Sequence, residues 1–259
     1  MTTLPASTPA LRAPALPALF QLWLSESRRL TREPMFLVGT VGFPVLFYSL
    51  VGMPRGDMTP EMSRAALLNL SAFSLVSLTL FSFGANVAAE RTGGWLRLLR
   101  ASPMPPGAYL GAKVLAAWVY GAASVALLMA YAGLVGGVWL GLWPSLLAVF
   151  KLLLGASPLV ALGLAIGFLV RPAGATVVAN VANLLLVFAG GLAMPLSMLP
   201  GFLTHLAPWL PTFHLGAVAR SALVPVADEA GHWLALLAFT ALFSVVALWA
   251  MRRDEARER

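Results

Sequence analysis

The sequence contains no cysteine, and charged residues make up only 10% of its 259 residues. The absence of cysteine excludes disulfide bonds, thiol nucleophiles and cysteine-ligated metal centres. Soluble domains usually carry about 25% charged residues. Here 59% of the residues are hydrophobic, which is more apolar surface than one hydrophobic core can bury. The composition therefore predicts a membrane protein rather than a soluble one.

Two kinds of functional pattern are also missing. No Asp or Glu lies deep within a long apolar segment, whereas ion-driven transporters usually hold carboxylates or histidines at that depth. The sequence contains neither the phosphate-binding Gly-x4-Gly-Lys-Ser/Thr loop nor the Gly-x-Ser-x-Gly elbow of serine hydrolases. We therefore expect no catalytic residue, no bound cofactor and no metal site in this chain.

Six apolar segments are long enough to cross a bilayer as helices, which takes about 20 residues. They cover approximately residues 36–53, 65–89, 114–140, 145–170, 175–194 and 233–251. The predicted fold is all-α, a polytopic membrane protein with a single domain over 1–259. We expect a cytosolic tail with an interfacial helix over 1–35, the six-span membrane domain over 36–251, and a second cytosolic tail over 252–259.

The net charge of +7 follows the predicted topology and does not indicate a nucleic-acid partner. With six spans both termini share a side, and that side holds most of the Lys and Arg residues, whereas the other side holds Arg55, Arg64 and Arg220. Because Lys and Arg concentrate in cytoplasmic loops, we expect both termini in the cytoplasm. Lys151 lies near the outer end of its predicted span, where it either snorkels to the interface or faces a cavity.

Residues 16–32 have the pattern of a two-sided helix. Leu19 and Trp23 belong to an apolar stripe, and basic residues lie mostly on the other side. Such a helix lies flat in a membrane interface, with its basic residues toward headgroups or a partner. The candidate contact residues are Trp23, Arg28, Arg29 and Arg32.

A basic insert, ERTGGWLRLLRASPMPPGAYLGAK, occupies residues 90–113 between two predicted spans. Its glycine pair permits a turn, residues 95–100 favour a short helix with an apolar side and a basic side, and a proline ends that helix. This surface suits contact with a soluble partner, and a loop that only rests on lipid is the alternative. The candidate contact residues are Glu90, Arg91, Gly93, Gly94, Trp95, Arg97, Leu98, Leu99, Arg100 and Pro103.

Polar side chains form a stripe on each of two predicted spans. Polar groups in hydrocarbon are costly unless they find partners, so both stripes should face protein or water. They either form hydrogen bonds between helices or line a substrate path. The residues are Ser71, Ser74, Thr79, Ser82 and Asn86 on the 65–89 span, and Thr176, Asn180 and Asn183 on the 175–194 span.

The segment 195–223 contains prolines that predict two helices of about ten residues, which begin near Pro200 and Pro211. Helices of that length cannot span a bilayer. They either dip into the outer leaflet and return, covered by protein, or lie on the surface. The candidate residues for an outer gate are Pro195, Pro200, Pro211 and His214.

Two patterns in this sequence resemble those of a known family. The insert reads Glu-Arg…Gly…Leu-Arg…Ser-Pro…Leu…Lys between the second and third predicted spans. A later run, Gly190-Gly191…Pro195…Leu199-Pro200…Pro211, precedes the last span. Together with the interfacial helix and the six spans, both patterns resemble the membrane subunits of ABC transporters of the type-2 exporter family.

The resemblance implies the membrane subunit of an ATP-driven exporter in a bacterial or archaeal cytoplasmic membrane. Two copies, as a homodimer, would pair with ATP-binding cassette subunits that hold ATP and Mg²⁺. Residues 95–99 would be the coupling helix, and the interfacial helix would also touch the ATPase. Spans one, two and five would line the path or the dimer seam. The outer helices would form the gate. Short outer loops favour a small amphipathic drug-like compound or a lipid as substrate. The alternatives are an ATP-independent secondary transporter or channel and a protein that only anchors an ATPase.

Overall fold

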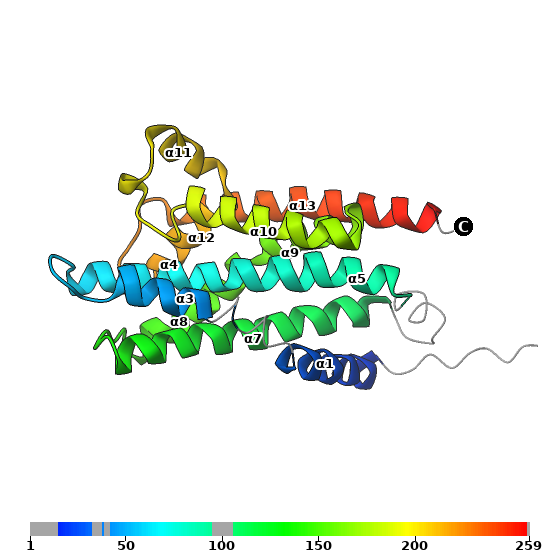
Figure 1. Cartoon of the computed structure of the whole chain (residues 1–259), viewed down its shortest axis with the longest axis horizontal. Helices are drawn as coiled ribbons and strands as arrows, with labels where there is room; N and C mark the ends of the chain where they lie inside the picture. The colour runs from blue at the N-terminus through cyan, green and yellow to red at the C-terminus, as the bar shows by residue number, and fades with distance from the viewer. Residues whose placement is uncertain (1–14, 33–37, 39–41, 95–105, 258–259) are drawn as a thin grey trace, which may run out of the picture.

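The computed structural model describes residues 15–32, 38, 42–94 and 106–257, and within these residues the only regular elements are helices. The long helices run alongside one another to form an elongated bundle (Figure 1). In chain order the elements are α1 (Ala15–Thr31), α3 (Phe43–Phe47), η2 (Tyr48–Gly52), α4 (Pro60–Thr79), η3 (Leu80–Ala85), α5 (Asn86–Thr92), α7 (Pro106–Leu134), α8 (Leu142–Gly155), α9 (Ser157–Leu169), α10 (Pro172–Ala189), η4 (Leu196–Met198), α11 (Gly201–Leu206), η5 (Ala207–Trp209), α12 (Pro211–Arg220) and α13 (Glu229–Arg257).

Five helical stretches among the described residues are long and apolar enough to cross a membrane. They are Pro60–Thr92, Tyr109–Leu134, Leu142–Leu169, Pro172–Ala189 and Glu229–Asp254. The prediction of an all-helical, multi-pass protein is therefore confirmed. The remaining predicted span, 36–53, is described only in part and contains the shorter apolar helix Phe43–Gly52. The count of six spans stays a prediction.

The two ends of the bundle differ in charge. The end where the C-terminus lies (Figure 1) carries Arg91, Lys113, Arg171 and Arg252, and we call it the basic end. The opposite end carries α11 and the turns that join η2 to α4 and α7 to α8. If the basic end faces the cytoplasm, as the Lys and Arg bias predicts, then α11 and α12 lie toward the outer side.

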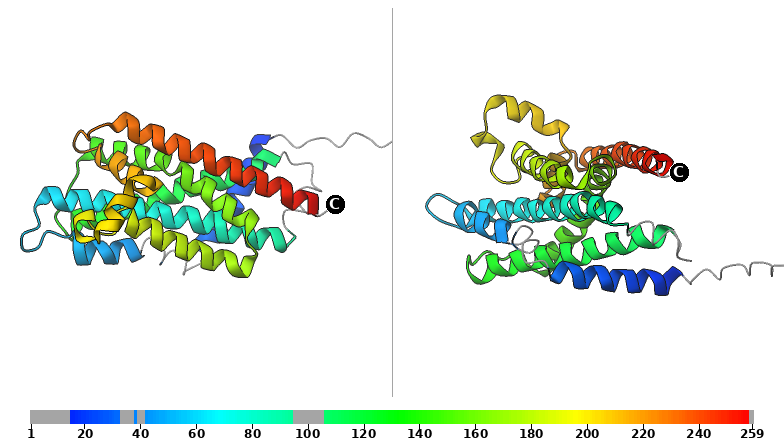
Figure 2. Two further views of the ribbon diagram at one scale, coloured as in Figure 1. Left: turned by 90° about the horizontal axis from the view of Figure 1, so that it is seen from above. Right: turned by 45° about the vertical axis from the view of Figure 1, so that its right-hand side comes forward.

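The continuous helix formed by α4, η3 and α5 occupies the centre of the bundle (Figure 2). Every residue from 70 to 80 is buried, which requires neighbours on all sides of the helix. Glycine on α9 permits one of these contacts: a Cβ at Gly163 would lie 2.8 Å from the Phe83 Cβ and 2.9 Å from the Thr79 carbonyl oxygen. Because no side chain intervenes, α9 packs directly against the backbone of η3.

Two predicted span boundaries were wrong. The third span was predicted over 114–140, but α7 runs from Pro106 to Leu134. It ends early because Gly137 has a φ of +66°, a backbone conformation that favours glycine, and the Val138 N–H then donates to the Ala132 carbonyl at 3.0 Å. The fifth span was predicted to reach residue 194, but α10 ends at Ala189, just before the glycine pair.

The expected break near Pro158 is confirmed, because α8 ends at Gly155 and α9 begins at Ser157.

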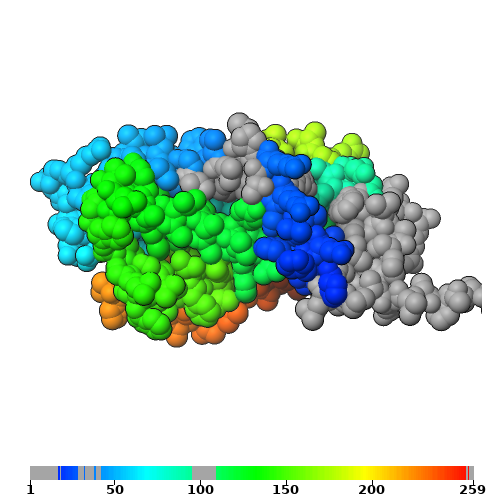
Figure 3. All heavy atoms as spheres, turned by 90° about the horizontal axis from the view of Figure 1, so that it is seen from below, coloured from blue at the N-terminus to red at the C-terminus, as the bar shows by residue number. Residues whose placement is uncertain are grey.

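The predicted N-terminal helix is also present as α1, which lies across α7 near the basic end (Figure 3). Close approach is possible there because Gly111 has no side chain: a Cβ at this position would lie 3.2 Å from Leu19 Cδ1. Thus α1 packs on the protein, and its contact with lipid stays a prediction.

The proline-rich segment forms two helices, as predicted, but they differ in burial. The helix α12 packs mainly against α4, α8 and α13, also touches α10, and most of its residues are buried. In α11, which is shorter than the predicted ten residues, no residue is buried, and the helix stands away from the bundle (Figure 1). Only α12 therefore enters the protein interior; the membrane depth of both helices stays a prediction.

Candidate functional site

Glu90 and Arg91 are consecutive residues in the last turns of α5 and point to different neighbours. The Gly93 N–H makes the last helical bond, to the Ala89 carbonyl at 2.9 Å. The helix ends there because Gly94 adopts a φ of +78°, which other residues rarely adopt. Residues 95–105, which include the predicted coupling helix, follow directly. The two side chains therefore hold the start of that segment.

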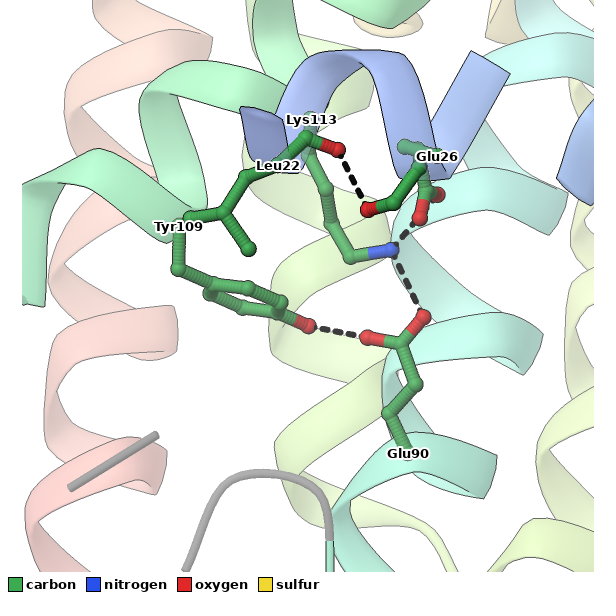
Figure 4. A network of polar contacts seen from close by, with 6 residues as sticks. Leu22, Glu26, Glu90, Tyr109 and Lys113 are labelled. Carbon is green, nitrogen blue, oxygen red and sulfur yellow. Dashed lines mark hydrogen bonds and ion pairs between the residues drawn. The ribbon is translucent and has the colours of Figure 1, made fainter. Parts of the chain in front are cut away.

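Glu90 joins α5 to α7 and α1 (Figure 4). The Lys113 ammonium on α7 donates to Glu90 Oε1 at 2.9 Å and to Glu26 Oε1 on α1 at 2.8 Å. The Tyr109 hydroxyl, one turn before Lys113, donates to the other Glu90 oxygen. Glu90 and Lys113 are the first and last residues of the basic insert, so their ion pair closes the base of that loop.

This cluster is buried. The Lys113 side chain is 2% exposed, and those of Glu90 and Glu26 are 9% and 13% exposed. Two carboxylates surround one ammonium group, and a hollow of about 260 Å³ lies beside them. Removing one partner of a buried ion pair is costly because it leaves a charge without compensation. The cluster therefore holds the basic-end termini of α1, α5 and α7 in one arrangement.

Arg91 joins α5 to α9 and α13. Its guanidinium donates to the carbonyl oxygens of Phe168 and Val170, the latter at 3.0 Å, and to Asp254 Oδ1 at 3.0 Å. Carbonyls at the C-terminal end of a helix lack partners within the helix and attract cations. Arg91 fills this role for α9 and at the same time forms an ion pair with α13. The planar guanidinium can serve several acceptors at once, which a lysine cannot do as well.

Together the two residues connect five elements at the start of the insert: α1, α5, α7, α9 and α13. A displacement of residues 95–105 would therefore be transmitted to several helices. The cluster has no nucleophile paired with a base. Within the residues that the structure describes, no group of three or more His, Asp or Glu side chains could hold a metal ion.

Comparison with known proteins identifies the family. A family model described as "ABC-2 family transporter protein" matches residues 60–249, which is more than half of the chain. The chain belongs to the ABC-2 transporter family. It is also 25% identical over 236 residues to the Bacillus subtilis (strain 168) protein named "Putative transport permease YvfS", a match that covers 90% of this chain and 96% of that protein.

Membership makes this ABC-2 chain a transport permease, the membrane subunit of an ABC transporter, and the family implies an ATP-binding cassette partner. The predicted coupling residues divide into two groups. Glu90, Arg91, Gly93 and Gly94 are described above. The others lie outside the described residues: Trp95, Arg97, Leu98, Leu99, Arg100 and Pro103.

Arg28 on α1 and Arg32 just after it are exposed, whereas the Trp23 indole nitrogen is buried and has no hydrogen-bond partner in the described part of the chain. The side chain of Arg29 is outside the description. A further contact docks the helix, because the Tyr120 hydroxyl of α7 donates to the Ser27 carbonyl at 2.8 Å.

Three residues of the first polar stripe bond to their own helix. The hydroxyls of Ser71, Ser74 and Thr79 are buried and donate to backbone carbonyls four residues earlier. Ser82 is buried without a hydrogen-bond partner among the described residues, and Asn86 is half-buried. Within a single chain this stripe therefore faces packed protein. Its role along a path between two copies stays a prediction.

The second stripe, on α10, lies partly at the surface. Thr176 and Asn180 are exposed, and the Asn180 amide donates to the Thr176 carbonyl at 2.9 Å. Asn183 is half-buried and accepts a hydrogen bond from Ser77 of α4 at 3.2 Å. Asn183 therefore joins α10 to α4, whereas Thr176 and Asn180 lie on an outward face of α10.

The predicted gate residues occupy the end opposite the basic end. Pro195 precedes η4, Pro200 precedes α11, and Pro211 is the buried first residue of α12. His214 Nε2 donates to the Pro208 carbonyl at 2.9 Å, so its Nδ1 accepts from His232 Nδ1 at 2.8 Å. Burial lowers the pKa of His214.

Several functional contacts were not predicted. Tyr109 and Lys113 contact Glu90, Asp254 contacts Arg91, and Glu26 contacts Lys113. The spacing of Tyr109 and Lys113, four residues apart, places them on one helix face and was a usable signal. Lys151 also has a partner that neither sequence alternative included: its ammonium donates to Glu229 at 2.7 Å and Ser221 at 2.8 Å.

Proposed function

We propose that this permease is the membrane subunit of an ATP-driven exporter and that ATP hydrolysis on a separate cassette subunit acts on it through residues 90–105. The observation that carries the proposal is the attachment of Glu90 and Arg91 to α1, α7, α9 and α13. A partner that displaces the insert would shift all these elements. Both termini and the insert would face the cytoplasm of a bacterial or archaeal cell, and the partner would hold ATP and Mg²⁺.

A second copy of the chain is part of the proposal. On α10 the apolar residues Val177, Val181, Leu184 and Leu185 are exposed together with Asn180. An amide that faces hydrocarbon is costly unless protein or water covers it, which supports a homodimer seam or substrate path along this face. The substrate class would be a small amphipathic compound or a lipid.

The first test is the variant Trp95→Ala in the complex of permease and cassette ATPase. A buried aromatic anchor contributes about 2 kcal/mol or more to an interface, so we expect weaker co-purification of the ATPase and reduced transport. Trp143→Ala is the matched control, because Trp143 is an exposed tryptophan at the opposite end of the bundle. Normal co-purification and full transport by Trp95→Ala would refute the coupling assignment.

The second test separates docking from transmission. Arg91→Gln keeps the insert but removes the ion pair with Asp254. We expect the ATPase to bind normally while substrate-stimulated ATPase activity falls about tenfold, within the usual range of coupling between sites. An unchanged stimulation would contradict the role of Arg91. Transport by the permease alone in liposomes, driven by an ion gradient, would support the secondary transporter instead.

A further inference from the structure

A groove on the bundle, separate from the basic-end cluster, has the dimensions of a ligand site. It lies between α7, α9 and α13, with the end of α8 completing its wall, and has a volume of about 610 Å³. This volume falls within the usual range for small-molecule pockets, about 300–1,000 Å³. On α13 its lining extends from Trp233 to Met251. At a rise of 1.5 Å per residue this is about 27 Å, close to the hydrocarbon thickness of a bilayer, about 30 Å.

The walls of the groove determine where its occupant comes from. α7, α9 and α13 all belong to stretches that are apolar enough to span a membrane, and the lining is mostly aliphatic and aromatic. An occupant therefore enters from the bilayer, and it must be apolar along most of its length. A long, narrow site of this kind fits a single hydrocarbon chain better than a folded polar compound.

Three hydroxyl groups interrupt the apolar lining near its middle, those of Ser157, Thr240 and Ser244, the last two about 6 Å apart along α13. Thr240 donates its proton to the Leu236 carbonyl at 2.7 Å, so Ser157 must donate to Thr240 across their 3.0 Å contact. This leaves the lone pairs of Ser157 free to accept. Ser244 also lines the groove and makes no hydrogen bond with the residues that the structure describes. Ser244 can therefore donate a hydrogen bond to an occupant, and Ser157 can accept one. A plain hydrocarbon chain could use neither group.

The basic end of the groove carries a cation. Leu248 lines the groove, and Arg252, four residues later on α13, lies one turn further along the same helix face. Arg252 is exposed and forms no ion pair within the described part of the chain. Eight residues separate Arg252 from Ser244, which corresponds to about 12 Å along the helix.

We propose that the groove binds an anionic, single-chain amphiphile from the bilayer, with its head at Arg252 and a hydrogen-bonding group about 12 Å along the chain. A fatty acid with a mid-chain hydroxyl has these features. That this amphiphile is also the exported compound rests on the function proposed above. The binding itself does not depend on the ATPase.

The experiment uses the full chain, without the ATPase, in phosphatidylcholine nanodiscs. Two photoreactive stearic acids carry the same diazirine, and only one has a mid-chain hydroxyl. We expect the hydroxylated probe to label peptides of α9 and α13 about fivefold more than the plain probe, the usual value of one hydrogen bond. Equal labelling by both probes, or labelling confined to other helices, would overturn the proposal.

Variants test each contact. Ser244→Ala should abolish the preference for the hydroxylated probe, and Ser244→Thr should retain it. Arg252→Gln should weaken labelling by the acid but not by its methyl ester. Leu237→Trp should block both probes, because Leu237 lines the groove, whereas Val245→Trp, at an exposed position outside the lining, should block neither. A preference that survives Ser244→Ala would count against the proposed orientation.

A last measurement distinguishes this inference from the proposed function. The hydroxylated acid is added to the complex of permease and ATPase, and ATP hydrolysis is recorded. Stimulation that Leu237→Trp removes supports the assignment of this amphiphile as substrate. Specific binding without stimulation would overturn the substrate assignment alone. Coupled transport of other compounds without labelling of the groove would overturn the groove site and leave the proposed function intact.

Discussion

Glu90 and Lys113 form an ion pair with 2.9 Å between Oε1 and Nζ, and they are the two ends of the basic insert. The pair closes a loop whose interior contains the predicted coupling helix. Because Lys113 also contacts Glu26 at 2.8 Å, the base of this loop includes α1. A push on the loop from a partner would thus reach the N-terminal helix and α7 together.

Lys113→Met should destabilise the permease strongly, because it removes the buried ammonium group that bonds both Glu90 and Glu26. Breaking a buried ion pair costs about 3–5 kcal/mol, and we expect a loss near the lower limit because a hollow of about 260 Å³ adjoins the pair. Thermal unfolding in detergent measures it. The double variant Glu90→Gln with Lys113→Met removes one carboxylate and should recover part of the loss. Equal stability of the single and double variants would show that charge is not the cause.

Gly163→Ala should destabilise the contact between α9 and η3. The added Cβ would lie 2.8 Å from the Phe83 Cβ and 2.9 Å from the Thr79 carbonyl oxygen, and overpacking of this kind costs about 1–3 kcal/mol. Gly201→Ala is the control, since a Cβ there meets open space. The unfolding temperatures of both variants check the prediction. A stable Gly163→Ala variant would mean that the helices separate easily at this point.

The histidine pair should make the end of the bundle opposite the basic end sensitive to acid. Burial lowers the pKa of His214 in the folded protein, so its contribution to stability is complete above the pKa of histidine in the unfolded chain and decreases as the pH falls below that value. Protonation would also place two N–H groups face to face at the His214–His232 contact, where the nitrogens are 2.8 Å apart.

Unfolding temperatures measured from about pH 8 to about pH 5 test the histidine prediction. The wild-type protein should lose stability over this range, and His214→Gln should lose less. His205→Gln serves as the control because His205 is exposed on α11. The assignment fails if His214→Gln and the wild type show the same pH dependence.

Cysteine cross-linking tests the proposed homodimer. The natural chain has no cysteine, so single substitutions need no background removal. Val181→Cys and Leu184→Cys, on the exposed face of α10 at 51% and 59% exposure, should form disulfide-linked dimers in membranes. Val245→Cys on α13 has comparable exposure, 65%, and should not. Cross-linking only at Val245 would place the seam elsewhere.

Much of the fold could be predicted because hydrophobic length and charge bias are local properties. The five described spans coincide with predicted apolar segments, and the break near Pro158 follows from the ring of that proline. Boundaries were less accurate, since α7 begins at Pro106 rather than near residue 114. A helix continues past the apolar residues wherever polar side chains such as Tyr109 and Lys113 find partners.

Of the candidate site, Glu90 and Arg91 were identified from the sequence, but their partners were not. Glu26 and Asp254 lie near opposite ends of the chain, 87 residues from Lys113 and 163 residues from Arg91 respectively, and no spacing pattern connects them. Similarly, the serines on α4 were recognised as a stripe, but only packing determined that their hydroxyls bond to their own helix.

The sequence alone determined that this chain is an all-helical membrane permease with a basic insert. The length of the apolar segments, the Lys and Arg bias, and the glycines and prolines that end helices are all properties of residues close together in the chain. The tertiary structure alone decided which charges meet, that α12 is buried while α11 is exposed, and that a groove remains between α7, α9 and α13. These features depend on contacts between distant segments, which form only when whole helices pack together.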